Sequence, residues 1–157
     1  MNSNSQAVSD HQLIVLLFQT RDLMLSLKRK ELRKFGITFE EAAVLIQIRK
    51  LGDKATPTEL SRQLLRKHHS ITGLLLRMEK KGLIKRNKDL KRKNMIRVSM
   101  TEKGEALYQD AKREDVLDKL VDILSDKQKQ DMANYLNILR DKAFDILGVE
   151  NKPEIPF

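Results

Sequence analysis

Residues 56–86 read "TPTELSRQLLRKHHSITGLLLRMEKKGLIKR", and this stretch predicts two short helices joined by a tight turn. The first helix is predicted to begin with Thr56 as its N-cap, with Pro57 at the first helical position and Glu59 closing a capping box. The second helix, predicted from about residue 69 to 81, carries its apolar residues at the i, i+3, i+4, i+7 spacing of one buried stripe: Ile71, Leu74, Leu75 and Met78. Gly82 predicts its end, so the stretch indicates a helix-turn-helix.

Two strand-like segments follow the second helix. "LIKRN" at 83–87 and "MIRVSM" at 95–100 alternate apolar with polar side chains, which is typical of half-buried strands. The tip between them, residues 88–94, is strongly basic, and five of the eight residues at 86–93 are Lys or Arg. Like charges repel one another, so a turn of this kind contributes little to folding and favours an external anionic partner. The segment therefore predicts a charged β-wing.

The flanks of this centre read as helices. The helix at 9–35 is predicted to end at Gly36, and "TFEE" opens the next helix as a capping box of Thr38 and Glu41. Further helices are predicted at 101–124 and from the Ser125 cap to residue 147. Six Gly and three Pro are too few for a turn-rich β-sandwich. We expect a mainly α fold with a small two- or three-stranded β-wing.

The positive charge is concentrated in the centre of the chain. The 157 residues carry a formal net charge of +9. Residues 54–97 contain 14 Lys and Arg against three acids, whereas the remainder holds 17 basic and 19 acidic residues. Because the excess is local, it indicates a polyanionic partner, with nucleic acid preferred to a membrane surface.

Several classes of protein are disfavoured by composition. The chain has no Cys, which excludes disulfides and thiolate-bound metals. No apolar run approaches the ~18 residues of a membrane span, and the polar N-terminus does not resemble a signal peptide. His68 and His69 would point about 100° apart on a helix, which disfavours a shared metal. With no catalytic triad or phosphate loop visible, we expect a cytoplasmic protein that is not an enzyme and has no cofactor.

The second helix and the wing supply the candidate contacts with double-stranded DNA. Small and hydroxylated side chains near the start of a groove-inserted helix permit close approach to bases, and Arg77 can reach guanine or a phosphate. A basic wing can reach phosphates or the adjacent minor groove. Leu76 fits neither the buried stripe nor this contact face cleanly. Ten contacts are predicted: His69, Ser70, Thr72, Gly73, Arg77, Lys80, Lys91, Arg92, Lys93 and Arg97.

Four segments together resemble the MarR family of bacterial transcription regulators. They are "LRKFGITFEEAAVL" at 32–45, "TPTELSRQL" at 56–64, "HHSITGLLLRMEKKGLIKR" at 68–86 and "MIRVSMTEKG" at 95–104. The resemblance spans residues 10–147. It implies a winged helix-turn-helix at 36–100, with 9–35 and 101–147 as a helical dimerisation region. Residues 1–8 and 148–157 are then a flexible N-terminus and a C-terminal tail.

The wing departs from the family pattern. Family wings carry an Asp-x-Arg motif whose Asp lies nine residues before the Thr of "TEKG", and those two positions are Arg92 and Asn94 here. Asp89 can serve only with a shifted register, which leaves Lys91 in the place of the Arg. Whether the wing keeps an internal salt bridge is therefore an open question for the structure.

The resemblance also implies partners. It implies a homodimer, formed through the terminal helices, that acts on an inverted repeat as a repressor and is released by a small, often anionic aromatic effector. The surplus apolar surface expected on residues 10–35 and 106–147 fits a dimer, whereas no residue identifies a ligand site. The alternative is a winged-helix module that binds protein or RNA without operator specificity.

Overall fold

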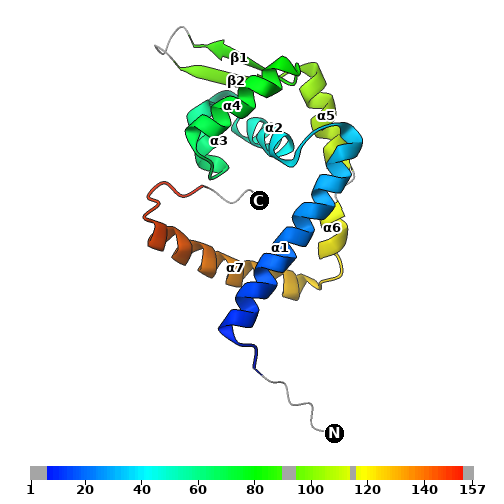
Figure 1. Ribbon diagram of the computed structural model, residues 1–157, viewed down its shortest axis with the longest axis vertical. Coiled ribbons are helices and arrows are strands. Elements are labelled where there is room, and N and C mark those ends of the chain that lie inside the picture. Colours follow the sequence, from blue (N-terminus) through cyan, green and yellow to red (C-terminus); the bar gives the residue numbers. More distant parts are fainter. Residues whose placement is uncertain (1–6, 90–94, 114–115, 154–157) are drawn as a thin grey trace.

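The computed structural model describes residues 7–89, 95–113 and 116–153 of the chain. Long helices at the two ends frame a small helical body that carries a two-stranded wing (Figure 1). The helices are α1 (Asp10–Leu32), α2 (Phe39–Leu51), α3 (Pro57–Gln63), α4 (His68–Lys80), α5 (Glu102–Arg113), α6 (Val116–Val121) and α7 (Asp126–Leu147). The strands are β1 (Ile84–Lys88) and β2 (Ile96–Met100), and the short 3-10 turns are η1 (Arg33–Phe35) and η2 (Gly52–Lys54). The mainly α fold with a small wing is confirmed.

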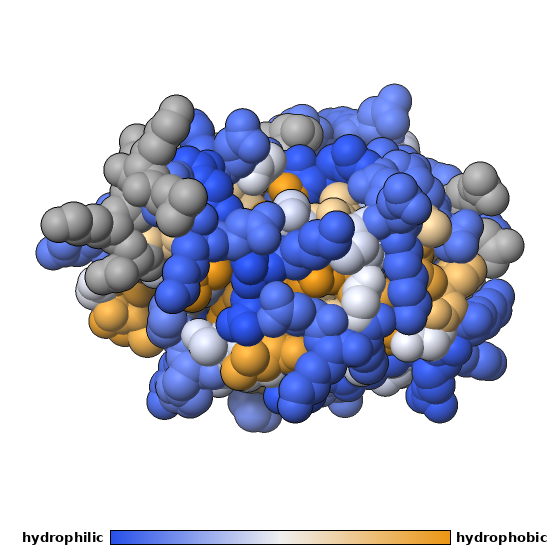
Figure 2. All heavy atoms as spheres, turned by 90° about the horizontal axis from the view of Figure 1, so that it is seen from above, coloured by the Kyte–Doolittle hydropathy of each residue, from blue (hydrophilic) through white to orange (hydrophobic). Residues whose placement is uncertain are grey.

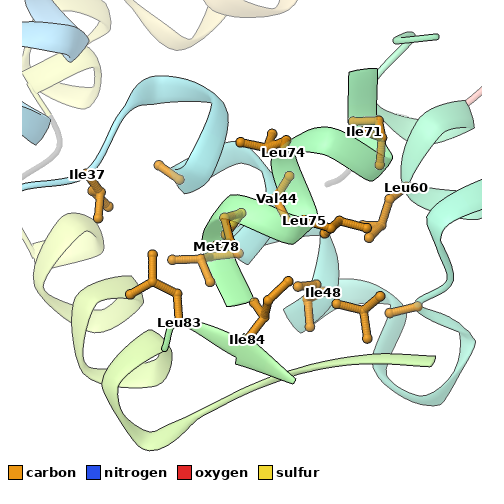
Figure 3. Close-up of a cluster of buried hydrophobic side chains, with 14 of the residues drawn as sticks. Ile37, Val44, Ile48, Leu60, Ile71, Leu74, Leu75, Met78, Leu83 and Ile84 are labelled. Atoms are coloured by element: carbon orange, nitrogen blue, oxygen red, sulfur yellow. The ribbon is translucent and has the colours of Figure 1, made fainter. Parts of the chain in front are cut away.

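The hydrophobic core lies under the helix-turn-helix, where α2, α3, α4 and the base of the wing meet (Figure 3). The predicted stripe of α4 is buried in full, with Ile71, Leu74, Leu75 and Met78 all pointing inward. Leu45 and Leu60 close this core from the two preceding helices, each with no exposed surface. A fully buried Leu or Met stabilises the fold by about 1.5–3 kcal/mol, so this stripe fixes which face of α4 remains outside.

The helix caps agree largely with the sequence signals. Thr38 and Ser125 form complete capping boxes with Glu41 and Gln128. Thr56 accepts the backbone N–H of Glu59 at 3.2 Å, but the second half of the predicted box is absent. The Glu59 carboxylate binds the side chains of Arg62 and Gln63 instead, because both lie within one turn of it on α3.

The wing is an antiparallel ribbon whose register runs from Ile84↔Met100 to Lys88↔Ile96. Val98 is buried on its inner side, and its N–H donates to the carbonyl of Ala55 at 2.9 Å. Among the described residues the sheet therefore has two strands, and the segment before α3 adds one backbone hydrogen bond to its edge. A wing of two or three strands was expected, and the described residues form one of two strands.

The junction between β2 and α5 explains the "TEKG" motif. The Thr101 hydroxyl donates to the carbonyl of Gly82 at 2.6 Å and accepts the N–H of Gly104 at 3.1 Å. A Cβ at residue 104 would overlap the carbonyl oxygen of Leu83, so only glycine lets α5 approach the start of β1 this closely. The motif thus fixes the angle at which the chain leaves the wing.

The expected helix at 101–124 is described as two helices, α5 and α6, on either side of residues 114–115. The carboxylate of Glu31 links α1 to α6. It accepts the N–H of Val116, the first residue of α6, at 2.8 Å, and binds the ammonium of Lys28 at 2.6 Å. Lys28 and Glu31 are both buried, each only 7% exposed. A side chain from α1 therefore satisfies the start of α6, a long-range contact that local periodicity does not encode.

The terminal helices α1 and α7 expose a large amount of apolar surface. The large apolar side chains exposed on α1 are Leu13, Ile14, Val15, Leu16, Phe18, Leu23 and Leu27. Those on α7 are Met132, Tyr135, Leu136, Ile138, Leu139, Ile146 and Leu147. Both helices extend beyond the body that carries the wing (Figure 1). Contiguous apolar surface of this extent marks an interaction site, and no helix of the described ranges is long and apolar enough to cross a membrane.

Candidate nucleic-acid interface

The outer face of α4 is set by the burial of its inner stripe. We define this face as His69, Ser70, Thr72, Gly73, Leu76, Arg77 and Lys80. His69, Ser70, Arg77 and Lys80 are exposed, and Thr72 and Gly73 are partly exposed. The structure thus brings together, on one side of one helix, all six contacts that were predicted on α4. Their contact with DNA itself remains a prediction.

Gly73 lies at the middle of this face without a reason inside the chain. A Cβ built there would meet only the Arg77 guanidinium, at an ordinary 3.7 Å. Glycine in a helix interior costs about 0.5–1 kcal/mol relative to alanine, so its presence here weakens α4 without relieving a clash. The missing side chain instead leaves the backbone of α4 open to close approach from outside.

Thr72 has its hydroxyl occupied. Its Oγ1 donates to the carbonyl of His68 at 3.0 Å, within the same helix. The part of Thr72 that is not hydrogen-bonded is its methyl group, which adds apolar character to the outer face of α4. The face therefore combines cations at its edge with a small apolar centre.

An ion pair bridges the wing where its strands end and its tip begins. The Arg97 guanidinium donates from Nε to the Asp89 carboxylate at 2.9 Å and from a terminal nitrogen to the carbonyl of Asp53. The Asp89 N–H also bonds the carbonyl of Met95 at 2.8 Å. An internal wing salt bridge is thus present, formed by a pair eight residues apart rather than by the family positions. It holds this end of the ribbon against the turn before α3, and the predicted contact Arg97 lies there.

A second ion pair ties the wing to α4. Glu79 accepts the Arg86 backbone N–H at 3.2 Å and its Nε at 2.8 Å. The hydrogen bond from the Arg86 guanidinium holds the pKa of Glu79 below its ordinary range. On α3, the hydrogen bond from Arg62 likewise lowers the pKa of Glu59. Both carboxylates are therefore ionised at neutral pH.

These ion pairs leave a net positive charge on the surface formed by α4 and β1. The three acids of residues 54–97, which are Glu59, Glu79 and Asp89, are each bound by an arginine of the same segment. No acid of this segment is left without an arginine partner. The exposed cations on α4 and β1 are Arg77, Lys80, Lys85 and Lys88. Seen from the end that carries the wing, hydrophilic side chains cover most of the molecule (Figure 2).

Some residues of this interface were not predicted from the sequence, and three that were predicted lie outside the described residues. Lys85 and Lys88 lie exposed on β1, three residues apart and so on opposite faces of the strand, and neither was among the predicted contacts. Asp89 and Asp53 were missed as partners of Arg97, because the pairing depends on strand register. The predicted tip contacts Lys91, Arg92 and Lys93 lie outside the described residues.

A separate cavity of about 250 Å³ opens where α1, α2 and α5 meet. Its walls are mainly apolar, with the exposed Lys50 and Lys112 at the edge and Lys28, paired with Glu31, inside. The lining residues are Lys28, Leu32, Ile37, Ala42, Leu45, Ile46, Lys50, Tyr108, Ala111 and Lys112. On its α2–α5 side, Arg49 pairs with Glu105 and lies 5.2 Å from the Tyr108 ring centre. An apolar cavity with a cationic edge suits a small apolar molecule that carries negative charge.

Comparison with solved structures finds the same architecture among transcription regulators. The chain aligns over its full length, at 26% identity and a TM-score of 0.83, with 94% of the organohalide-sensing regulator RdhR-CbdbA1625 in its ligand-free form. The 2,4-dichlorophenol-bound form of that protein gives 25% identity and a TM-score of 0.82, with 100% of this chain and 98% of that chain covered. The Staphylococcus aureus MepR–DNA complex shares the fold at 21% identity and a TM-score of 0.74, over 88% of this chain and 99% of MepR.

A family model adds evidence from the sequence itself. The comparison with curated proteins gives no match. Residues 35–93, which run from η1 through α4 into the wing, match the model of the MarR family. This segment contains the outer face of α4 and β1, and the fold around it is that of the regulators above. The match over residues 35–93 and the fold shared over the full length make the chain similar to winged helix-turn-helix transcription regulators of the MarR family.

Proposed function

We propose that the protein is a sequence-specific, double-stranded DNA-binding repressor that acts in the cytoplasm as a homodimer on an inverted-repeat operator. The observation that carries this proposal is the outer face of α4, where a glycine with no internal role lies among exposed cations. A helix inserted in the major groove reads base edges through such a face, while a basic wing adds phosphate contacts. Residues 36–100 form the DNA-binding region of the proposal, and 9–35 with 101–147 the dimerisation region.

The ten predicted contacts take three roles in this proposal. The α4 residues His69, Ser70, Thr72, Gly73, Arg77 and Lys80 face the major groove, while Lys91, Arg92 and Lys93 at the wing tip meet phosphate or minor groove. Arg97 has its guanidinium bound to Asp89 and to the Asp53 carbonyl, which supports a role in positioning the wing. Lys85 and Lys88 are added here as phosphate contacts because both are exposed on β1.

An effector that weakens DNA binding is the second part of the proposal. The cavity between α1, α2 and α5 joins the proposed dimerisation region to the helix that supports the helix-turn-helix. A ligand seated there would act on the angle between α1 and α2, and so on the spacing of the two recognition helices of a dimer. The dichlorophenol complex of a relative at 25% identity supports a compound of that kind, with an apolar ring and an acidic group.

The test is selection of bound fragments from genomic DNA by the full-length protein, followed by salt titration on the enriched sites. We expect an inverted repeat, bound by two protomers, with affinity that falls steeply as salt rises. The Lys85→Ala, Lys88→Ala double variant is expected to weaken binding to all sequences and, with four lysines lost per dimer, to flatten the salt slope by up to about four. Lys119→Ala, which removes an exposed charge on α6, is the matched control and should leave the slope unchanged.

Two outcomes would overturn the proposal. Binding without any enriched sequence would show that the protein lacks operator specificity. A stronger, equally salt-dependent interaction with RNA, or none with DNA at low salt, would favour the alternative of a protein- or RNA-binding module. Either result would leave the winged helix-turn-helix fold intact.

A further inference from the structure

Leu76 is a large apolar side chain on a face that is otherwise polar and basic. It follows two leucines that are buried, Leu74 at 8% exposed and Leu75 at 0%, yet Leu76 itself is 41% exposed. The hydrophobic core that α4 helps to form does not include it. Its exposure therefore follows from the phase of α4, not from a gap in the packing.

The neighbours of Leu76 on the helix surface define what it can touch. Residues three and four apart in a helix lie side by side, so Thr72, Gly73, Glu79 and Lys80 surround it, and the Glu79 carboxylate is bound by Arg86. Gly73 presents no side chain, and the Thr72 hydroxyl is bound to the helix backbone. The Leu76 isobutyl group and the Thr72 methyl group thus form a small apolar patch between flanking cations.

The proposed function places this patch in the major groove, and the inference rests on that placement. Base edges in the major groove carry hydrogen-bonding groups, apart from the C5-methyl group of thymine. An apolar side chain makes no hydrogen bond with these groups, but it can bury apolar surface against the thymine methyl group. The cations around Leu76 match the phosphates that flank the groove, which makes DNA a better occupant than an apolar protein surface.

We propose that Leu76 is a specificity-determining residue that contacts the C5-methyl group of one thymine in each half-site of the operator. Thr72 adds a smaller apolar contact to the same position, and Gly73 allows the helix to come close enough for both. Discrimination at this base pair then comes from burial of a methyl group, whereas discrimination elsewhere comes from hydrogen bonds such as those available to Arg77.

Replacement of thymine by deoxyuridine isolates this contact, because it removes only the methyl group. The probe is a duplex of the enriched site in which each symmetry-related pair of thymines is replaced in turn. For the wild-type protein we expect one pair whose replacement weakens binding by about fourfold per methyl group, the effect of one buried methyl. For Leu76→Ala the same replacement should have no effect, while the Arg77→Ala variant should retain the full effect.

Several results would contradict the inference. An unchanged deoxyuridine penalty in Leu76→Ala would show that another group contacts the methyl, and the absence of any sensitive thymine with wild type would show that no such contact exists. A shift in the self-association of Leu76→Ala would assign this side chain to an interface between copies. Failure of the proposed function is recognised separately, because no enriched site would then exist from which to build the probe. Thermal unfolding checks that Leu76→Ala folds, as expected for an exposed position.

Discussion

Two glycines show how single residues divide between folding and function in this protein. Both lie inside helices, where glycine is unfavourable. At Gly104 the reason is internal, because a Cβ there would overlap the carbonyl of Leu83. At Gly73 the surroundings are open apart from the Arg77 side chain, so the reason lies outside the chain. The same residue type therefore maintains a packing contact in one helix and an open surface in another.

Alanine at each glycine should separate these roles. Gly104→Ala is expected to lower the free energy of unfolding by about 1–3 kcal/mol, because α5 must move away from the start of β1. Gly73→Ala should raise it by about 0.5–1 kcal/mol through helix propensity, yet weaken operator binding by about tenfold because a methyl group then separates α4 from the groove. Urea denaturation and DNA titration of both variants give the comparison. Stronger DNA binding by Gly73→Ala would contradict the assignment of an outward contact to that position.

Single positions were predictable where a periodic pattern fixes them. Ile71 and Met78 set the phase of α4, and from that phase the exposure of Arg77 and Lys80 follows. The same phase places Leu76 on the outer face of the helix, although leucine is usually a core residue. The Arg97–Asp89 pair could not be predicted, since it depends on the register Lys88↔Ile96 and hence on the length of the wing tip.

At the scale of elements, the wing is attached to the helix-turn-helix at three places. Arg86 binds Glu79 of α4, Val98 donates to the carbonyl before α3, and Arg97 joins Asp89 to the turn at Asp53. A two-stranded ribbon alone is marginally stable, so these contacts determine how the wing sits relative to α4. These contacts thus fix the ribbon on the helix-turn-helix along its length, up to the residues where the tip begins.

Asp89→Asn tests whether this attachment matters for DNA binding. Asp89 is an acid at a basic surface, so removal of its charge should strengthen binding if electrostatics alone were at work. We expect the opposite, an affinity for DNA about fivefold lower. Arg97 then loses its ion pair with Asp89, which is partly exposed and contributes about 1 kcal/mol to the position of the wing. Fluorescence anisotropy with one labelled duplex measures the change, and Asp118→Asn, at an exposed acid on α6, is the control. Tighter binding by Asp89→Asn would show that the pair does not position the wing.

The elements themselves followed from local signals more readily than their joints did. Caps at Thr38 and Ser125 and a stop at Gly36 appear where the sequence indicates them. The partner of the Val116 N–H was not visible, because it is the Glu31 carboxylate of α1, 85 residues earlier in the chain. The burial of Lys28 also depends on Glu31, because the Glu31 carboxylate binds the Lys28 ammonium and replaces its hydrogen bonds to water.

The whole molecule has an outward apolar surface on α1 and α7 that none of the described residues covers. Phe18, Leu23, Tyr135 and Ile138 each expose more than 60% of their area. Proteins that act alone rarely retain such surface, and a second copy buries the same patch on both partners through one two-fold axis. The cavity between α1, α2 and α5 lies beside this surface, so a ligand there would act on both the dimer and the DNA-binding region.

The dimer is tested by a charge placed on that surface. Ile138→Asp should shift the protein from dimer to monomer in sedimentation equilibrium, because it buries a carboxylate against apolar side chains of the partner. Lys127→Asp places the same residue at an exposed position of α7 outside the apolar surface and should remain dimeric. The melting temperature of the wild-type protein should rise with protein concentration, whereas that of Ile138→Asp should not, because dissociation is coupled to unfolding only in a dimer.

Operator binding should follow the oligomeric state. A monomer contacts one half-site and loses the second set of phosphate and base contacts, so Ile138→Asp should bind the inverted repeat about a hundredfold more weakly and show a shallower salt slope. Its affinity for an isolated half-site should match that of the wild-type protein, since the outer face of α4 is unchanged. If Ile138→Asp instead remains dimeric and binds the full operator normally, the apolar surface of α7 serves a different partner and the copies must meet elsewhere.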